Sequence, residues 1–314
     1  MANRPKIPKI SVLLTTYNRR RLLERAVASV LAQDEPDFEL VVVDDGSTDD
    51  TRAYLAAVTD PRLRVVSSSR NRGIAATRNL GLDAAGADIV AMLDDDDVYL
   101  PGRLSVPLDV LARDGDVVAT VSSIKKIGEK RATVTRLPDA TLAPDVFEWA
   151  LICDLFDVDG TGMTFRRQDA IAVGGFNGGL KWHEDREFLL RLARRGSGRL
   201  IAEPLWQKSW TPGSLTGRRD QAGDSLRLYL ATRADYLARF RKLGTYFATK
   251  VLVTDARHFL LGALWRDLRG FRAAGLIDGN ILRMWRDHRE VRRYRRAMSQ
   301  PQALAQLAGP PDAW

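Results

Sequence analysis

The first third of the chain alternates apolar, β-branched runs with stretches whose apolar residues recur at helical spacing. This alternation predicts βα units that build a parallel sheet, with strands suited to burial on both faces. The expected strands are Ile10–Thr15, Phe38–Asp44, Leu63–Ser67 and Asp88–Leu93. The expected helices are Arg20–Gln33, Asp49–Val58 and Ile74–Ala85.

Polar residues follow three of these strands. The segments Thr15–Asn18, Asp44–Ser47 and Asp94–Asp97 each stand where an expected strand ends. Ligands of open α/β sheets bind at the carboxyl ends of the strands. We therefore expect the three segments to meet in one crevice.

The regular alternation weakens after Pro101. The expected elements there are a short helix around Pro107, strands at Val117–Ile124, Ala132–Arg136 and Thr161–Arg166, a turn at Gly174–Phe176 and a helix at Glu184–Arg195. From about Asp220 the pattern is helical to Ser299, with breaks expected at Gly244, Gly270 and Gly279 and a loose tail from Pro301. We expect a domain over residues 1–220, made of halves 1–101 and 102–220, and a helical region over 221–314.

Charge separates the last region from the rest. Residues 1–220 carry 31 Lys and Arg against 32 Asp and Glu, whereas residues 221–314 carry 17 against 8. The whole excess of the net charge of +8 therefore lies in the last third. It indicates either a surface that meets an acidic partner or a solvated arginine face.

The remaining composition indicates a folded protein without a membrane span. Its 314 residues are 45% hydrophobic, yet no uncharged apolar run reaches the roughly 18 residues that a span needs. The short basic start lacks the apolar part of a signal peptide, so we expect a cytoplasmic location. The single cysteine, Cys153, excludes an internal disulfide.

Four consecutive aspartates, Asp94 to Asp97, end the strand that begins near Asp88. Such a run repels itself strongly unless a cation or solvent relieves it. Carboxylate oxygens suit Mg²⁺ or Mn²⁺, and Mg²⁺ is commonly held by one or two carboxylates plus substrate phosphates. The alternative at this point is an exposed acidic turn before the next helix, with Asp97 as its cap.

A second acidic pair, Asp44 and Asp45, ends another strand of the same sheet. A carboxylate there can accept a hydrogen bond from a base N–H or from ribose hydroxyls. No dinucleotide fingerprint or P-loop follows any of the strands. The two acidic loops together favour a nucleotide diphosphate held through a cation.

These motifs resemble family-two glycosyltransferases of the GT-A fold, over roughly residues 8 to 210. The residues that carry the resemblance are Thr15-Thr16-Tyr17-Asn18, Val43-Asp44-Asp45-Gly46-Ser47, Asn71-Arg72-Gly73 with Arg78-Asn79, Leu93 to Pro101, and Glu184-Asp185. The resemblance implies a Rossmann-like α/β fold with a mostly parallel central sheet flanked by helices, extended here by C-terminal helices.

The resemblance also implies roles for the strand-end residues. Nucleoside and donor contacts fall on Thr15, Thr16, Tyr17, Asn18, Asp44, Asp45, Asn71, Arg72, Gly73, Arg78, Asp94 and Asp95. Uridine is the common nucleoside. Asp96 is the expected ligand of Mn²⁺ or Mg²⁺, although four aspartates in succession leave this register open by one position.

By the same resemblance, Asp185 is the catalytic base and Glu184 its partner. A base is needed because the attacking sugar hydroxyl must lose its proton. The alternative role is stabilisation of a helix N-terminus by acids in its first turn. The preceding Trp182 and His183 are candidate acceptor contacts.

Arg218 and Arg219 follow in a polar stretch that we expect to form a lid over the diphosphate. Processive relatives carry a Gln-x-x-Arg-Trp motif near this point, whereas this chain has Gln207-Lys208-Ser209-Trp210. Transfer of a single sugar is therefore expected.

The last long helix combines an apolar stripe with arginines. The stripe consists of Ile281, Trp285, His288, Val291 and Met298. It favours packing or homodimerisation, with an anionic membrane surface as the alternative and nucleic acid as the least favoured partner.

We expect an inverting transferase that moves a sugar from a UDP-sugar or related donor to a hydroxyl of a glycan, glycolipid or small molecule. The alternatives are a nucleotidyltransferase, which usually needs an early glycine-rich loop absent here, and a non-catalytic nucleotide-sugar or nucleic-acid binding module. The sequence does not identify the sugar or the acceptor.

Overall fold

The structure is a computed structural model that describes residues 7–128, 131–180, 183–209, 232, 240–257 and 259–311. The chain divides by contacts into two compact units. The first comprises residues 1–148, 157–178 and 184–211, and the second comprises 149–156, 179–183 and 212–314. No helix in the described ranges is both long and apolar enough to cross a membrane.

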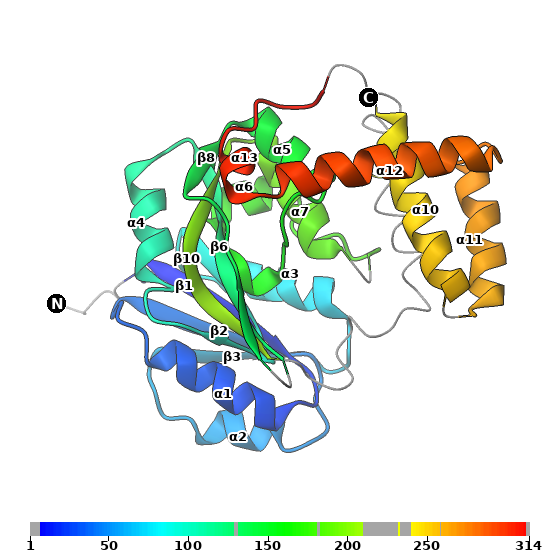
Figure 1. Cartoon of the computed structure of the whole chain (residues 1–314). Helices are drawn as coiled ribbons and strands as arrows, with labels where there is room; N and C mark the ends of the chain where they lie inside the picture. The colour runs from blue at the N-terminus through cyan, green and yellow to red at the C-terminus, as the bar shows by residue number, and fades with distance from the viewer. Residues whose placement is uncertain are drawn as a thin grey trace. The chain divides into compact units, whose positions relative to one another are not determined.

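The elements follow the expected alternation in the first half (Figure 1). The strands are β1 Ile10–Thr16, β2 Phe38–Asp44, β3 Leu63–Ser67, β4 Ile89–Asp94, β5 Asp97–Tyr99, β6 Val117–Ile127, β7 Ala132–Thr135, β8 Ala140–Leu142, β9 Met163–Arg166 and β10 Ser197–Ser209. The helices are α1 Arg20–Leu31, α2 Thr51–Ala57, α3 Ile74–Ala84, α4 Ser105–Arg113, α5 Pro144–Ile152, α6 Arg167–Ala172, α7 Glu184–Ala193, α10 Arg241–Arg257, α11 Leu261–Ala273, α12 Ile281–Met298 and α13 Pro301–Ala305, with a short 3-10 helix η1 at Gly160–Gly162.

All described strands belong to one sheet of the first unit. Its order is β3-β2-β1-β4-β9-β6-β10-β5, with β7 beside β6 and β8 beside β10. The strands β3, β2, β1 and β4 are parallel, as are β6 and β10, whereas β9 runs antiparallel to both β4 and β6. The expected α/β fold with a central sheet flanked by helices is confirmed.

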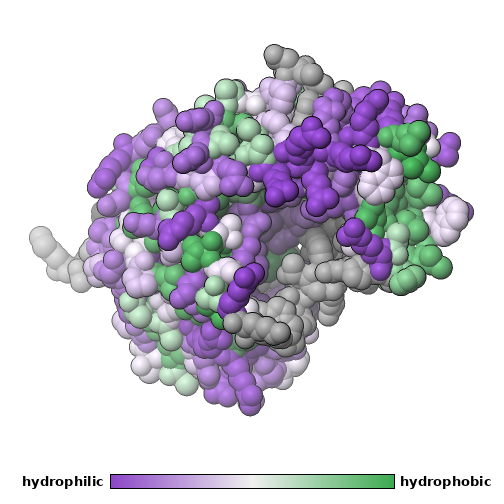
Figure 2. All heavy atoms as spheres, viewed as in Figure 1, coloured by the Kyte–Doolittle hydropathy of each residue, from purple (hydrophilic) through white to green (hydrophobic). Residues whose placement is uncertain are grey.

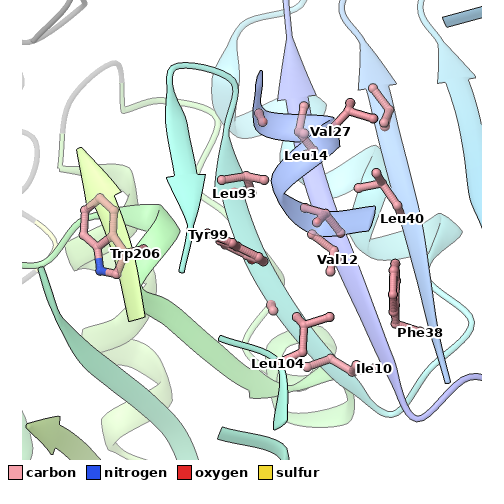
Figure 3. Packing of buried hydrophobic residues seen from close by; sticks show 14 of the residues in the cluster. Ile10, Val12, Leu14, Val27, Phe38, Leu40, Leu93, Tyr99, Leu104 and Trp206 are labelled. Carbon is pink, nitrogen blue, oxygen red and sulfur yellow. The ribbon is translucent and has the colours of Figure 1, made fainter. Parts of the chain in front are cut away.

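The core forms because strand side chains alternate between the two faces of the sheet. Ile10, Val12 and Leu14 of β1 pack with the buried side of α1 in one apolar cluster, which Figure 3 shows from close by. Leu13 points to the other face, where α3 approaches so closely that a Cβ at Gly81 would lie 2.6 Å from the Leu13 side chain. The two helices therefore clamp β1 from opposite sides and fix the position of its carboxyl end.

One strand differs from the expected burial. β3 was expected to be buried on both faces, but it pairs only with β2 and its residues are exposed or half-buried. A strand at the edge of the sheet has a neighbour on one side only, and Arg64, the second residue of β3, is half exposed.

The described part of the second unit is helical. Within it, the indole Nε1 of Trp149 donates to the hydroxyl of Tyr294 on α12 at 2.9 Å. Arg295 donates to the hydroxyl of Tyr246 on α10 and to Asp154. These contacts attach the last half of α12 to the rest of the unit.

The breaks expected at Gly244 and Gly270 and the loose tail expected from Pro301 are wrong. α10 runs through Gly244 and α11 through Gly270 without a break, because packing outweighs the roughly 1 kcal/mol that an interior glycine costs. The tail from Pro301 is not loose but begins with α13. The stripe on α12 is only partly buried: Val291 is inaccessible, whereas Ile281 and Trp285 are 65% and 43% exposed.

Candidate active site

The carboxyl ends of β1, β2 and β4 lie side by side. The parallel register sets Thr15 opposite Asp94 and Thr16 opposite Asp44. The Thr16 hydroxyl then donates to Oδ2 of Asp95 at 2.8 Å. The three polar strand ends thus meet as the sequence predicts.

The loops after β1 and β2 hold each other. The side-chain carbonyl of Asn18 accepts from the backbone N–H of Thr48 at 2.7 Å, and the Ser47 hydroxyl accepts from the N–H of Asn18 at 2.9 Å. Asn18 has a left-handed φ of 53°, which asparagine tolerates better than most residues. These hydrogen bonds between the two loops hold Tyr17, which is 41% exposed, at the edge of its loop.

Asp44 and Asp45 are buried and already hydrogen-bonded. Asp44 accepts from the N–H of Ser47 at 2.9 Å and from Nε of Arg52 at 2.8 Å. Asp45 accepts from the N–H groups of Arg72 and Gly73 at 2.8 and 3.0 Å. Asp45 therefore fixes the segment 71–73 against the end of β2, with Asn71, Arg72 and Gly73 exposed.

The four aspartates occupy four different environments. Asp94 ends β4, Asp95 and Asp96 form the turn, and Asp97 begins β5. Asp96 has only a long contact of 3.4 Å from Arg19. Because their surroundings differ, the four carboxylates are not interchangeable.

One of them, Asp97, differs from expectation. Asp95, whose expected contact with the donor stays a prediction, is buried and accepts from Thr16 and, at 3.1 Å, from Arg19. Asp97, expected to cap the next helix, accepts instead from the Thr161 hydroxyl at 2.6 Å inside the sheet. The strand β5, which the sequence pattern does not predict, turns Asp97 inward.

The surroundings of Asp95, Asp96 and Asp97 disfavour the ionised form of their carboxyl groups. Burial raises the pKa of Asp95 to about 6, against the opposing effect of Arg19. Burial and then the charge of Asp94 also raise the pKa of Asp96 and of Asp97. An added cation would therefore be stabilised at the turn.

Arg78 joins the run to the late acidic pair. Its guanidinium donates to Asp94 Oδ1 at 2.8 Å and to Glu184 Oε1 at 2.9 Å, with only 3% of the side chain exposed. Burial alone would lower the pKa of Arg78, but Asp94, Glu184 and Asp185 raise it above its usual value. The buried Arg78 guanidinium therefore connects Asp94 with Glu184, which follows Arg78 by 106 positions.

Glu184 and Asp185 begin α7, and only Glu184 is deeply buried. Burial, and then the neighbouring Asp185 charge, raise the pKa of Glu184 to about 7, although Arg78 opposes the shift. Asp185 is half-buried, and its Oδ1 accepts from the N–H of Arg186 at 2.7 Å. The pair thus combines a buried acid with a more accessible one.

Sequence reasoning missed two cations and one acid of this site. Lys208 on β10 lies opposite Asp97 of β5 in register and pairs with the carboxylate of Asp159. Arg19 contacts Asp95 and Asp96. Arg19 directly follows the polar segment at the end of β1, so its presence in the site could have been predicted from the sequence. Lys208 lies in the site only because β10 pairs with β5.

The residues fit a divalent cation only together with a substrate. In the described ranges, no three His, Cys, Asp or Glu side chains are arranged to hold a metal by themselves. Asp94 and Asp96 keep the most accessible carboxylates of the run, with side chains 29% and 17% exposed. One or two carboxylates completed by phosphate oxygens and water match the usual shell of Mg²⁺.

Some expected contacts cannot be placed. Trp182, Arg218 and Arg219 lie outside the described residues. His183 belongs to the second compact unit and has a left-handed φ of 62°. The acceptor contacts and the lid therefore stay predictions.

Comparison with known proteins agrees with this geometry. The model of glycosyl transferase family 2 matches residues 11–171, just over half of the chain. The succinoglycan biosynthesis protein ExoO of Rhizobium meliloti is 36% identical over 146 residues. This match covers 44% of the present chain and 41% of the relative, so the chain spans about two fifths of the length of that curated relative.

Two solved structures share the fold. TarS of S. aureus in complex with UDP-GlcNAc has a TM-score of 0.65 at 20% identity, covering 95% of this chain and 92% of that chain. The mannosyltransferase PcManGT of Pyrobaculum calidifontis, in complex with GDP-Man and Mn²⁺, has a TM-score of 0.57 at 21% identity, covering 99% and 88%. These two structures show the fold alone, whereas the family match opposes the nucleotidyltransferase and the non-catalytic module. The chain belongs to glycosyltransferase family 2 and has the GT-A fold.

Proposed function

We propose that this glycosyltransferase transfers one sugar, with inversion, from a nucleoside diphosphate sugar to a hydroxyl of a glycan, glycolipid or small molecule. One observation carries the proposal: Arg78 holds Asp94, at the end of the nucleotide-binding strand, and Glu184, beside the proposed base, on the same guanidinium. Donor binding is thereby assigned to the Asp94 side of the buried Arg78 guanidinium, and proton removal to its Glu184 side.

The nucleoside is assigned to the ends of β1 and β2. Thr15, Thr16, Tyr17 and Asn18 supply its pocket, and the exposed ring of Tyr17 suits stacking on a base. A UDP-sugar is the proposed donor, and TarS, which shares the fold, was solved with UDP-GlcNAc.

Asp44 and Asp45 complete the pocket together with Asn71, Arg72 and Gly73. Because Asp44 and Asp45 already accept bonds from the chain, they also position the loops that surround the nucleoside. Their contribution is therefore to hold the pocket as well as to contact its ligand.

The diphosphate is assigned to the aspartate turn. Asp96 is the proposed ligand of Mn²⁺ or Mg²⁺, with Asp94 beside the donor, and PcManGT was solved with Mn²⁺. When bound, the cation supplies neutralisation of the charge that builds on the departing diphosphate. Asp95 acts through Arg19, which it holds beside Asp96.

The base is assigned to Asp185. The acceptor oxygen forms its bond to the anomeric carbon as the bond from that carbon to the diphosphate breaks, and Asp185 takes the hydroxyl proton. The electron pair of the broken bond leaves on the diphosphate, so the configuration at the anomeric carbon inverts. Glu184, held by Arg78, keeps the start of α7 in place for this proton transfer.

The test is turnover of UDP-sugars in the presence of Mn²⁺, with the anomeric configuration of the product read by NMR. Asp185→Asn is expected to lower kcat by about 10²-fold or more, because proton removal in the transition state is lost. Asp145→Asn is the matched control, since Asp145 also stands in the first turn of a helix and is exposed.

Two results oppose the proposal. Retention of kcat in the Asp185→Asn variant removes Asp185 as the base and leaves only its effect on the helix. A product with retained configuration rules out the single displacement.

A further inference from the structure

The second unit presents apolar side chains to solvent beside arginines that have few acidic partners among the described residues. Six of the eleven exposed large hydrophobic residues in the described ranges fall between residues 259 and 285, so the exposure is concentrated rather than scattered. Figure 2 shows hydrophobic surface over α11 and the start of α12, next to hydrophilic surface along the rest of α12. Concentrated apolar exposure of this kind marks an interaction surface.

The outer face of α12 consists of residues that recur every three or four positions. They are Leu282, Trp285, Arg286, Arg289, Glu290 and Arg293. They line one open hollow of about 750 Å³. The Leu282 side chain is 83% exposed, whereas a leucine on a helix face that packs against a neighbouring helix is buried.

Among the described residues, packing within the unit uses mainly the opposite side of α12, and Glu290 is the one residue of the outer face that forms an ion pair with another helix, through Lys242 on α10. The inner side of α12 carries the buried Asp287 and Val291 and the contacts of Tyr294 and Arg295. The rest of the outer face is therefore not needed to attach the helix.

The charge of the outer face is positive and largely uncompensated. Glu290 is occupied by Lys242 at 2.7 Å, and Arg286 has only a contact of 3.7 Å to Asp287. Arg289 and Arg293 have no acidic partner among the residues that the structure describes. Three guanidinium groups therefore remain to bind anions from outside.

We infer that the outer face of α12 binds the surface of an anionic phospholipid bilayer. Leucine and tryptophan side chains insert at the boundary between headgroups and acyl chains, while arginines bind the phosphates above it. Both requirements are met on one helix face, with Leu282 and Trp285 on its first turns and Arg286, Arg289 and Arg293 along the remainder.

Other partners fit the same residues less well. A two-fold dimer through this face would bring the arginines of one copy against those of the other. Nucleic acid would pair with the arginines and would offer a base to Trp285, but it leaves the aliphatic Leu282, 83% exposed, without an apolar environment. A lipid surface satisfies the charged and the aliphatic side chains together.

The test is sedimentation of the full chain with vesicles of phosphatidylcholine and phosphatidylglycerol, compared with vesicles of phosphatidylcholine alone. Binding is expected only to the anionic vesicles at about 0.1 M salt and is expected to weaken sharply at about 1 M, where the screening length falls from about 10 to 3 Å. No sugar donor is present, so the outcome is independent of the proposed transferase activity.

Two variants separate charge from insertion. Replacing Arg286, Arg289 and Arg293 by Gln is expected to weaken binding roughly 125-fold, at about fivefold for each arginine near the surface. Its matched control replaces the exposed Arg113, Arg131 and Arg136 by Gln, which removes the same charge elsewhere. This control is expected to bind within a few-fold of the wild type.

The second variant, Leu282→Gln with Trp285→Gln, is expected to reduce binding by at least tenfold, since it removes the inserting groups. Ile171→Gln with Val134→Gln is its control, because those side chains are exposed to a similar degree in the first unit. All substitutions are on exposed side chains, and unchanged thermal unfolding verifies that each variant is folded.

Several results would overturn the inference. They are equal binding by the surface variants and their controls, absence of binding to anionic vesicles, and a dimer in light scattering that the Leu282→Gln and Trp285→Gln substitutions dissociate. Binding of duplex RNA that depends on the three arginines, without binding of vesicles, would also overturn it.

Discussion

Replacing Arg78 by methionine tests whether the Arg78 guanidinium stabilises the site by pairing with both of its carboxylates. The side chain keeps a similar length but loses its charge, which leaves the carboxylates of Asp94 and Glu184 without their shared partner. The Arg78 side chain is 3% exposed and the Glu184 side chain 12%, so solvent screens the pair weakly. Breaking a buried pair in this way costs about 3–5 kcal/mol, most of it from the charge that remains.

The same reasoning predicts that a second substitution restores stability. In Arg78→Met with Glu184→Gln the more buried of the two uncompensated charges is gone and only the more exposed Asp94 keeps its charge, so the double variant is expected to be more stable than Arg78→Met alone. The destabilisation by Arg78→Met is also expected to be smaller at pH 5 than at pH 8. Glu184, whose pKa is raised by burial, takes up a proton at the lower pH and no longer needs the cation.

The measurement is thermal unfolding followed by tryptophan fluorescence at both pH values. A loss of 3–5 kcal/mol corresponds to a fall of roughly 6–20 °C in Tm for a domain of this size. The control is Arg113→Met, whose partner Asp109 is also exposed and whose ion pair contributes less than about 1 kcal/mol. A fall in Tm no larger than that of the control, or strict additivity of the two substitutions, would refute the reasoning.

Three further predictions concern the same region. A nucleoside diphosphate at 100 times its Kd is expected to stabilise the wild type by about 2.7 kcal/mol, which a thermal-shift assay reads as a rise in Tm. Asp96→Asn is expected to abolish the part of this rise that depends on Mn²⁺. An unchanged rise excludes Asp96 as the metal ligand. Wild-type stability is expected to fall as pH rises from about 4.5 to about 7, because the folded state binds the Glu184 proton more tightly than the unfolded chain, and Glu184→Gln is expected to flatten this fall in Tm against pH. Gly46→Ala is expected to cost more than Gly73→Ala in urea unfolding, since both have φ near +80° but only at Gly46 would the new Cβ lie 2.7 Å from the Arg70 backbone; equal losses contradict the steric argument.

The sequence predicts the first half of the fold well because local pattern and tertiary environment agree there. Runs such as Val41-Val42-Val43 are suited to a strand with neighbours on both sides, and β1, β2 and β4 have them. β3 carries the same local signal but lies at the edge. Its exposure depends on strand order, which the composition of a strand does not encode.

The site is predictable in its acids and less so in its cations. Asp44, Asp94 and Asp96 stand directly after predicted strands, so a rule about strand ends finds them. Lys208 reaches the site only because β10 pairs with β5 in a particular register. Arg78 lies within a helix, and its second partner follows 106 residues later, so no local pattern reveals the bridge.

The clamp between Asp45 and the segment before α3 limits how this enzyme can hold a phosphate. Many nucleotide-binding proteins place a phosphate at the N-terminus of the helix that follows a strand, where free N–H groups and the helix dipole attract an anion. Here the N–H groups of Arg72 and Gly73 already donate to a carboxylate of the protein, and that carboxylate repels a second anion. The carboxylate of Asp45 thus partly offsets the positive end of α3, and attraction of the diphosphate depends more on side-chain cations and on whatever cation arrives with the donor.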